Sequence, residues 1–166
     1  MKMSRTCKIL ACILLLCALA CGCGEKTNPE HVKFKNDVDN FCNSIAELDA
    51  SINKIDATSD TATTQLLGYL DEVELRFKNF ADLDFPAEFD YLENLADEAS
   101  SYMSVAVEYY HNAFSNGSYN EYTAEYAQEN YSRAIKRIKI IITFLKGETP
   151  DDTNVIISYE GSSAAE

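Results

Sequence analysis

Apolar residues recur every three or four positions along most of the chain after residue 28, a spacing typical of amphipathic helices rather than strands. Asn28 followed by Pro29 is typical of a helix start, with the asparagine as N-cap and the proline in the first turn. These features predict a first helix over residues 29–56. Its apolar stripe consists of Phe34, Val38, Phe41, Ile45, Leu48, Ile52 and Ile55.

A second stripe follows the polar residues 56–60 and predicts a helix that ends near Asp82. Pro86 predicts the start of a third helix, because the proline ring disfavours helical geometry at the preceding Phe85. The second stripe consists of Ala62, Leu66, Tyr69, Val73, Phe77 and Phe80. The third consists of Leu92, Ala96, Ala99, Met103, Ala106, Tyr110 and Ala113.

A fourth helix is expected after Asn116 and Gly117, which form a strong turn signal. Gly147 and Pro150 end the pattern, as residues that commonly follow a helix. The fourth stripe consists of Ala124, Ala127, Tyr131, Ala134, Ile138, Ile141 and Leu145. Because alanine recurs on the third and fourth stripes, these two helices are expected to approach each other closely.

Long helices joined by short loops favour antiparallel neighbours, so the sequence predicts an all-α, four-helix up-down-up-down bundle over residues 29–147. A three-helix bundle with one broken helix is the alternative. Residues 148–166 have the composition of an acidic, flexible tail. Within this tail the β-prone residues 155–159 either add a short strand or stay disordered.

The first 24 residues have a different composition. Lys2, Arg5 and Lys8 precede twelve residues without a charge, from 9 to 20, which is the pattern of a secretory signal peptide. The uncharged stretch covers the 16 residues 9–24. A membrane-spanning helix needs about 20 apolar residues, so a permanent transmembrane segment is the weaker interpretation.

Five of the six cysteines lie in this segment, and the run Leu19-Ala20-Cys21-Gly22-Cys23 resembles the lipobox of bacterial lipoproteins. In that family small or apolar residues precede a cysteine whose sulfur receives diacylglycerol before cleavage. The resemblance implies a signal peptide over 1–22, a lipidated Cys23 with a tether to residue 28, and attachment to the outer face of the bacterial cytoplasmic membrane or envelope. Cys21 is the alternative register. Neither cysteine has leucine at the third preceding position, a departure from the commonest lipobox pattern.

Lipidation has physical consequences for the mature chain. Stable attachment generally takes two acyl chains, and a diacylglycerol supplies both, typically as palmitate-like chains. Cys42 is then the single cysteine left, so the fold is expected to depend on a packed core. From residue 24 onward 11 basic residues face 27 acidic ones, a net charge of −16. Nucleic acid is therefore excluded as a partner, since binding it requires a basic footprint.

Motifs that carry chemistry are sparse. Glu108 and His111 have the Glu-x-x-His spacing of di-iron bundles, but such sites need two copies and further carboxylates, and Glu108 is expected to face outward. The chain has neither a nucleophile elbow nor a phosphate-binding glycine loop. The sequence therefore predicts a protein that is not an enzyme and has no metal or cofactor. The alternative is a metal-binding or enzymatic protein built on the bundle.

Aromatic residues gather where the third helix ends and the fourth begins. In the predicted topology this is the end farthest from the anchor, where Lys54 is the one basic residue among the eleven of the mature chain. Tyrosine is enriched at interfaces, and an acidic surround favours a cationic partner. We therefore expect a patch here that binds an envelope protein or another cationic ligand. Its residues are Tyr109, Tyr110, Phe114, Tyr119, Tyr122 and Tyr126.

Resemblance beyond the lipobox rests on the third and fourth helices. Phe85-Pro86 before a long alanine-rich helix and the turn Asn116-Gly117-Ser118-Tyr119 are similar to the helical domains of many small bacterial lipoproteins. This similarity implies a bundle at the cell surface and transfers no catalytic residue. The combined expectation is a membrane-anchored, extracytoplasmic module that binds or scaffolds envelope components.

Overall fold

The computed structural model describes residues 28–115 and 118–150, and the regular secondary structure in these ranges is helical. The elements are α1 (Pro29–Ile52), α2 (Ala62–Ala81), the 3-10 helix η3 (Ala87–Leu92), α3 (Glu93–Ala113) and α4 (Glu121–Leu145). The all-α fold class is thus confirmed for the described residues. The predicted signal peptide, Cys21, Cys23 and the tail from residue 151 lie outside them.

Helix α1 begins where the sequence predicts and ends earlier. The Asn28 side chain accepts a hydrogen bond from the backbone N–H of Glu30 at 3.1 Å, and Pro29 occupies the first turn. The predicted end at residue 56 is wrong, because α1 stops at Ile52. Beyond it the backbone N–H of Asn53 and its side-chain amide both bond to the Asp49 carbonyl, each at 2.9 Å. The chain then tightens into turns that break the helical repeat.

The segment after Pro86 differs from the single long helix predicted there. Pro86 is extended, with a ψ of 146°, and Phe89 donates a hydrogen bond to its carbonyl at 2.6 Å, three residues back. This 3-10 geometry turns nearby aromatic side chains toward two different helices. The Phe89 ring lies 5.7 Å from that of Phe34 in α1, and the Tyr91 ring 5.7 Å from that of Phe144 in α4. The α-helix starts only at Glu93.

Helix α4 ends as predicted at glycine. Gly147 has a φ of +75°, in the left-handed region where a side chain would be strained. Its N–H bonds to the Phe144 carbonyl at 2.8 Å, and the N–H of Glu148 reaches the Thr143 carbonyl at 3.1 Å. These bonds satisfy the last carbonyls of the helix and turn the chain away from its axis.

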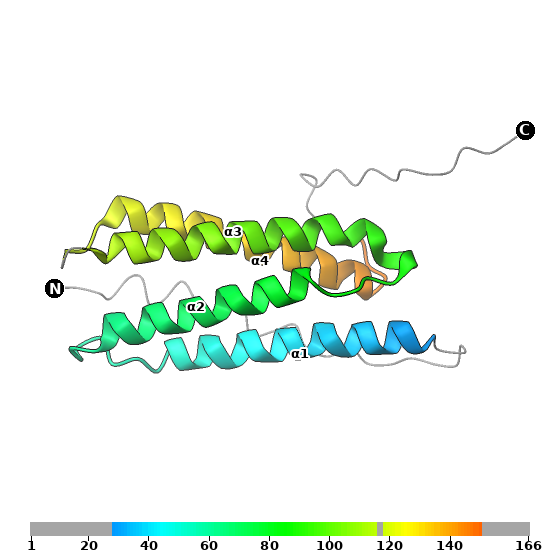
Figure 1. Ribbon diagram of the computed structural model, residues 1–166, viewed down its shortest axis with the longest axis horizontal. Helices are drawn as coiled ribbons and strands as arrows, with labels where there is room; N and C mark the ends of the chain where they lie inside the picture. Colours follow the sequence, from blue (N-terminus) through cyan, green and yellow to red (C-terminus); the bar gives the residue numbers. More distant parts are fainter. Residues whose placement is uncertain (1–27, 116–117, 151–166) are drawn as a thin grey trace, which may run out of the picture.

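Each helix packs on its neighbour in sequence: α1 on α2, α2 on α3, and α3 on α4. Figure 1 shows the four helices side by side along one axis, with the chain reversing direction at each connection. The most extensive contact joins α3 and α4. The alanines of the two predicted stripes are buried, and those with no exposed area are Ala96, Ala99, Ala106, Ala113, Ala127 and Ala134.

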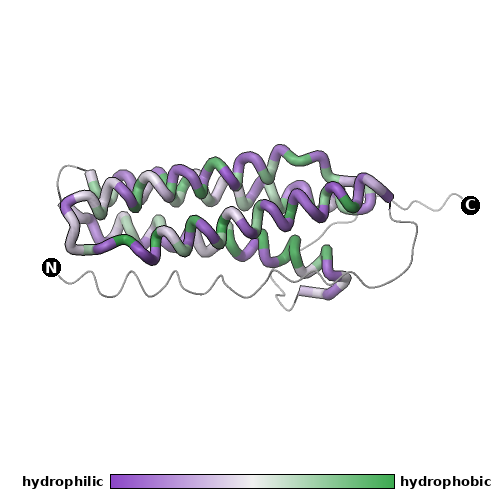
Figure 2. The backbone as a smooth tube through the Cα atoms, turned by 90° about the horizontal axis from the view of Figure 1, so that it is seen from below, coloured by the Kyte–Doolittle hydropathy of each residue, from purple (hydrophilic) through white to green (hydrophobic). Residues whose placement is uncertain are grey.

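The core consists largely of the predicted stripes. Every stripe residue of α4 is buried, and so is every stripe residue of η3 and α3 except the partly buried Tyr110. Hydrophilic and hydrophobic residues interleave along the helices, as one-sided burial requires (Figure 2). Core positions that the stripes missed are Leu70, Leu95, Val107, Ile140 and Ile142. Within the described ranges, none of the helices has the length and apolar character needed to span a bilayer.

Candidate functional site

The connection between α3 and α4 positions the predicted aromatic residues. The backbone N–H of Asn120 bonds across the connection to the Ala113 carbonyl at 2.8 Å, which holds the two helix ends together. The Asn120 side chain also caps α4 by accepting a hydrogen bond from the Thr123 N–H at 3.1 Å. Phe114 and Tyr119 therefore lie on either side of a closed turn.

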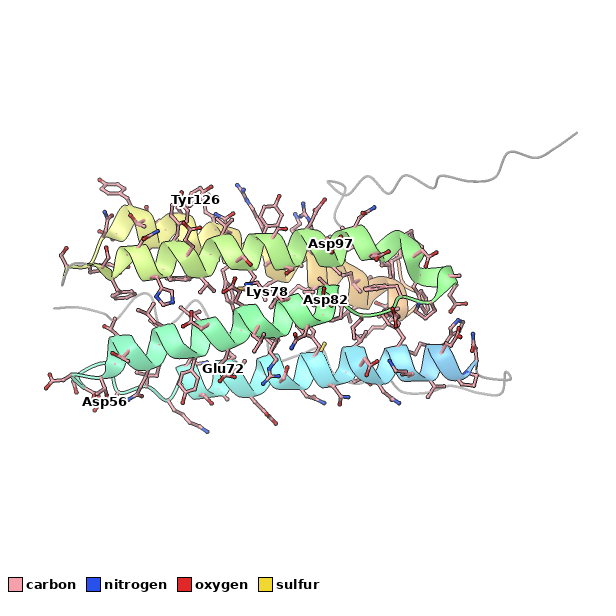
Figure 3. All side chains as sticks on the ribbon, in the orientation of Figure 1. Asp56, Glu72, Lys78, Asp82, Asp97 and Tyr126 are labelled. Carbon is pink, nitrogen blue, oxygen red and sulfur yellow. The ribbon has the colours of Figure 1, made fainter. Side chains whose placement is uncertain are left out.

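Four of the six predicted residues form two pairs of neighbouring rings near this turn, and these four together with Tyr122 are called the aromatic cluster. The Tyr109 and Tyr126 rings are 4.5 Å apart, and the Phe114 and Tyr119 rings 5.2 Å apart. Tyr122, one turn before Tyr126 on α4, is 85% exposed, whereas Tyr119 and Tyr126 are each 43% exposed. Figure 3 shows Tyr126 at the end of the molecule that also holds Asp56 of the loop between α1 and α2. This end lies opposite the start of α1.

Tyr110 is the exception among the six. Its hydroxyl donates a hydrogen bond to Gln128 Oε1 at 2.7 Å, and its ring packs against the hydrophobic core. Burial, assisted by the neighbouring Tyr119, raises the pKa of Tyr110 to about 12. Tyr110 therefore supports the cluster from inside and contributes little to its surface.

The surface around the aromatic cluster is acidic. The first half of α4 and the end of α3 expose four carboxylates there, namely Glu108, Glu121, Glu125 and Glu129. Partial burial raises the pKa of Tyr119, and the charges of Glu121 and Glu125 raise it further. A ligand that meets the exposed rings also meets this negative potential, so the surface suits a cationic group.

Glu108 and His111 do not act together, although their spacing suggested a metal site. Glu108 is exposed, as expected, while His111 Nε2 lies 2.6 Å from Asp71 Oδ1 of α2. Across the described residues, no group of three or more histidine, cysteine, aspartate or glutamate side chains is arranged to hold a metal ion. His111 instead links α3 to α2.

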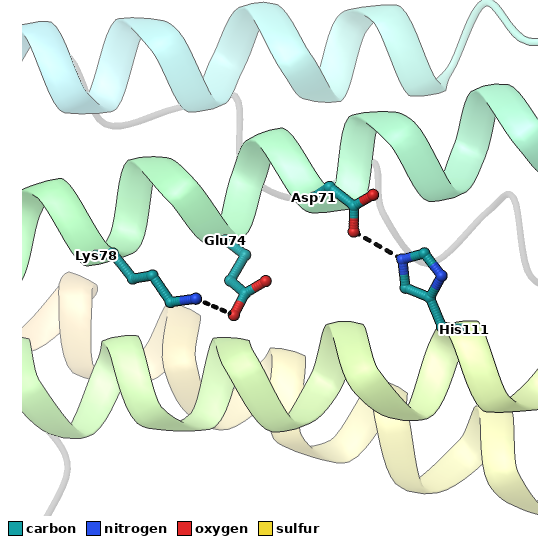
Figure 4. A network of polar contacts seen from close by, with 4 residues as sticks. All are labelled: Asp71, Glu74, Lys78 and His111. Atoms are coloured by element: carbon teal, nitrogen blue, oxygen red, sulfur yellow. Dashed lines mark hydrogen bonds and ion pairs between the residues drawn. The ribbon is translucent and has the colours of Figure 1, made fainter.

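An ion pair within α2 lies beside that link (Figure 4). Lys78 Nζ lies 2.6 Å from Glu74 Oε1. Burial would raise the pKa of Glu74, but hydrogen bonds from Lys78 and Ser104 outweigh burial and hold the pKa below its usual value. Each carboxylate in Figure 4 is paired, Asp71 with His111 and Glu74 with Lys78. We therefore interpret these contacts as structural, joining α2 to α3.

A groove between α1 and α2 has a volume of about 210 Å³. It is lined by polar side chains such as Asn40 and Asn79 around the Phe41 ring. Pockets for small-molecule ligands usually measure about 300–1,000 Å³. The groove is therefore smaller than a typical ligand site, and the aromatic cluster stays the principal candidate.

A buried carboxylate is a feature that no sequence motif indicates. Asp49 of α1 is 2% exposed, and its Oδ2 accepts a hydrogen bond from the Asn53 amide at 3.2 Å. No described residue gives Oδ1 a hydrogen bond. Burial raises the pKa of Asp49 above its usual value, and burial together with the Asp49 charge raises that of Tyr131 in α4. Asp49 lies four residues after Ile45, so the helical spacing already placed it on the buried stripe.

We expect Asp49→Asn to raise the free energy of unfolding at neutral pH by about 1–3 kcal/mol, since a buried charge without its full set of hydrogen bonds is costly. The pKa of Asp49 is higher in the folded state than in the unfolded chain, so its contribution to stability falls as pH rises through the folded value. Urea unfolding of both proteins should therefore show a smaller gain at about pH 4, near the unfolded pKa. An equal gain at both pH values would contradict this origin.

Comparison of the chain with known protein families, with curated proteins and with solved structures gave no match.

Proposed function

We propose that this chain is a bacterial lipoprotein whose helical domain acts as a non-catalytic binding or scaffolding module of the cell envelope. Residues 1–22 are removed, Cys23 receives diacylglycerol, and the domain is held at the outer face of the membrane. The support for the anchor is the basic, apolar and cysteine-rich sequence that ends in Leu19-Ala20-Cys21-Gly22-Cys23. Cys21 is the alternative attachment point.

The domain itself is an up-down-up-down four-helix bundle in this proposal. Contacts between successive helices and the reversal of direction at each connection support that arrangement (Figure 1). The tether joins the start of α1, so the turn between α3 and α4 lies at the opposite end of the molecule. The aromatic cluster is then presented away from the membrane, where a partner in the envelope reaches it.

The observation that carries the binding role is the exposure of three tyrosines within eight residues, just before α4 and on its first turns. Tyr119, Tyr122 and Tyr126 are among the few large hydrophobic side chains that the described residues expose, and the others, Val32 and Leu75, lie on different helices. Tyrosine combines a large apolar ring with a polar hydroxyl and is enriched in interfaces. The surrounding glutamates favour a cationic protein or peptide as the partner.

We expect Tyr119→Ala combined with Tyr122→Ala to lower capture of cross-linked partners from native envelope about tenfold or more, because exposed aromatic anchors carry much of the energy of an interface. The measurement is quantitative mass spectrometry of partners captured by the acylated protein. Helical circular dichroism should be unchanged, since both side chains are exposed.

The matched control combines Val32→Ala with Leu75→Ala, which also removes two exposed large side chains but lies outside the cluster. This control is expected to capture the same partners as the unmodified protein. Equal capture by all three proteins, with the fold intact, would rule out the aromatic cluster as the binding surface.

A further inference from the structure

The charge of α4 reverses along its length. Its first half contains three acidic residues, Glu121, Glu125 and Glu129, and the first basic residue of the helix is Arg133. No acidic residue occurs between Asn130 and Gly147. The basic residues of this second half are Arg133, Lys136, Arg137, Lys139 and Lys146. In a chain with a net charge of −13, this concentration of cations on one half-helix is unusual.

Two of these cations are held together by α3. The guanidinium carbons of Arg133 and Arg137 lie 5.8 and 5.4 Å from the centre of the Tyr102 ring. Arg137 Nε donates a hydrogen bond to Glu98 Oε2 at 2.6 Å. Like charges four residues apart on a helix repel each other. The Tyr102 ring and the Glu98 carboxylate attract the two guanidinium groups and offset this repulsion.

Arg133 keeps hydrogen-bond donors available. Its ion pair with Glu129 spans 3.9 Å, which is too long for a hydrogen bond, and its side chain is 51% exposed. Guanidinium groups recognise phosphate oxygens in a planar, two-pronged geometry. The structure therefore presents an exposed arginine, beside a second one, to an external anion.

The position of this face adds a second, independent observation. The end of α4 and the start of α1 lie at the same end of the molecule (Figure 1). Six residue steps separate Cys23 from Pro29, a reach of about 20 Å for an extended chain. The rise from residue 133 to 146 along a helix is also about 20 Å. If Cys23 is acylated, the whole basic half of α4 lies within reach of the lipid surface.

We propose that the basic half of α4, residues 133–146, docks on the anionic phospholipid surface of the membrane that holds the anchor. This inference rests on the proposed lipid attachment of Cys23. Glu98 and Glu129 lie beside this segment and offset part of its positive charge. Acidic residues more than about 8 Å away oppose docking only weakly, because such charges are largely screened at physiological ionic strength. The glutamates in the first half of α4 are repelled by the same surface. The domain therefore tilts, and the aromatic cluster stays away from the membrane.

The test measures how fast individual lysines are acetylated when the mature, acylated protein is reconstituted into vesicles. One set of vesicles contains phosphatidylcholine alone, and the other also contains phosphatidylglycerol. Each lysine or arginine near an anionic membrane surface contributes about 1 kcal/mol to binding, equivalent to about a fivefold change in an equilibrium constant. A docked amino group is shielded from the reagent, so Lys136, Lys139 and Lys146 should react about fivefold more slowly on the anionic vesicles. Lys54, at the other end of α1, should not change. High salt should remove the difference.

Two variants of equal charge make the test specific. Arg133→Gln with Lys139→Gln should abolish most of the protection of Lys136. Lys35→Gln with Lys54→Gln removes the same charge from exposed positions outside α4 and should leave that protection intact. Exposed positions were chosen for the first variant, so its circular dichroism should match that of the unmodified protein.

Two failures are distinguishable. If the acylated protein floats with both kinds of vesicle but the three lysines of α4 react equally on them, docking is wrong while the anchor stands. If the mature protein carries no acyl chain and does not float with phosphatidylcholine vesicles, the anchor is wrong and the docking proposal falls with it.

Discussion

Phe77→Ala should lower the free energy of unfolding of the domain by about 3–5 kcal/mol, the usual cost of removing a buried aromatic side chain. Phe77 of α2 is 1% exposed, and its ring meets that of Phe41 in α1 edge to face at 5.2 Å. Truncation therefore removes an aromatic contact and leaves a cavity between two helices. Urea unfolding followed by circular dichroism measures the loss.

Leu75 provides the control for this prediction. It is a large apolar residue on the same helix, two positions away, and is 50% exposed. Leu75→Ala should change stability by less than about 0.5 kcal/mol, as surface substitutions usually do. Similar losses for the two variants would show that α2 does not bury the face that the structure assigns to it.

Cys23→Ala should abolish acylation, and because cleavage follows acylation the variant should also keep residues 1–22. Each methylene of an acyl chain contributes about 0.8 kcal/mol to membrane attachment, so the loss of two chains removes nearly all affinity that the anchor provides. Mass spectrometry of the N-terminus measures both effects, and membrane flotation of a chain that begins at residue 24 measures the attachment that remains without the anchor. Any attachment by the basic half of α4 alone should be weak and should disappear in high salt.

Cys21→Ala distinguishes the two registers of the lipobox-like run. It should leave both acylation and flotation unchanged if Cys23 is the attachment point. An acyl chain found on Cys21 would move the mature N-terminus by two residues, and an unmodified N-terminus in the native protein would overturn the lipoprotein proposal.

The helices were predictable because a helix in a small domain must bury one face. The spacing of Phe34, Val38, Phe41 and Ile45 identifies that face in α1, and all four residues are buried. Asp49 follows the same spacing, so the sequence contained the signal for a buried carboxylate. The residue type indicates the opposite, because a charged residue is normally expected at the surface.

The aromatic cluster was predictable in composition and only partly in geometry. Its residues fall near one turn, and the turn brings Tyr109 to Tyr126 and Phe114 to Tyr119. Tyr110 belongs to two predictions, because its spacing places it on the buried stripe and its position near the turn places it in the binding patch. The hydrogen bond to Gln128, a residue of another helix, shows which role the hydroxyl has.

By itself, the sequence determined the helical class, most of the core and the helix caps at Asn28 and Gly147, because these depend on residue type and on spacing within one segment. Contacts between segments decided the rest. The chain after Pro86 forms a 3-10 helix that allows Phe89 and Tyr91 to reach α1 and α4. The packing of α4 on α3 likewise brings Arg133 and Arg137 to the Tyr102 ring. Such partners are distant in sequence, so only the packed structure brings them within contact range.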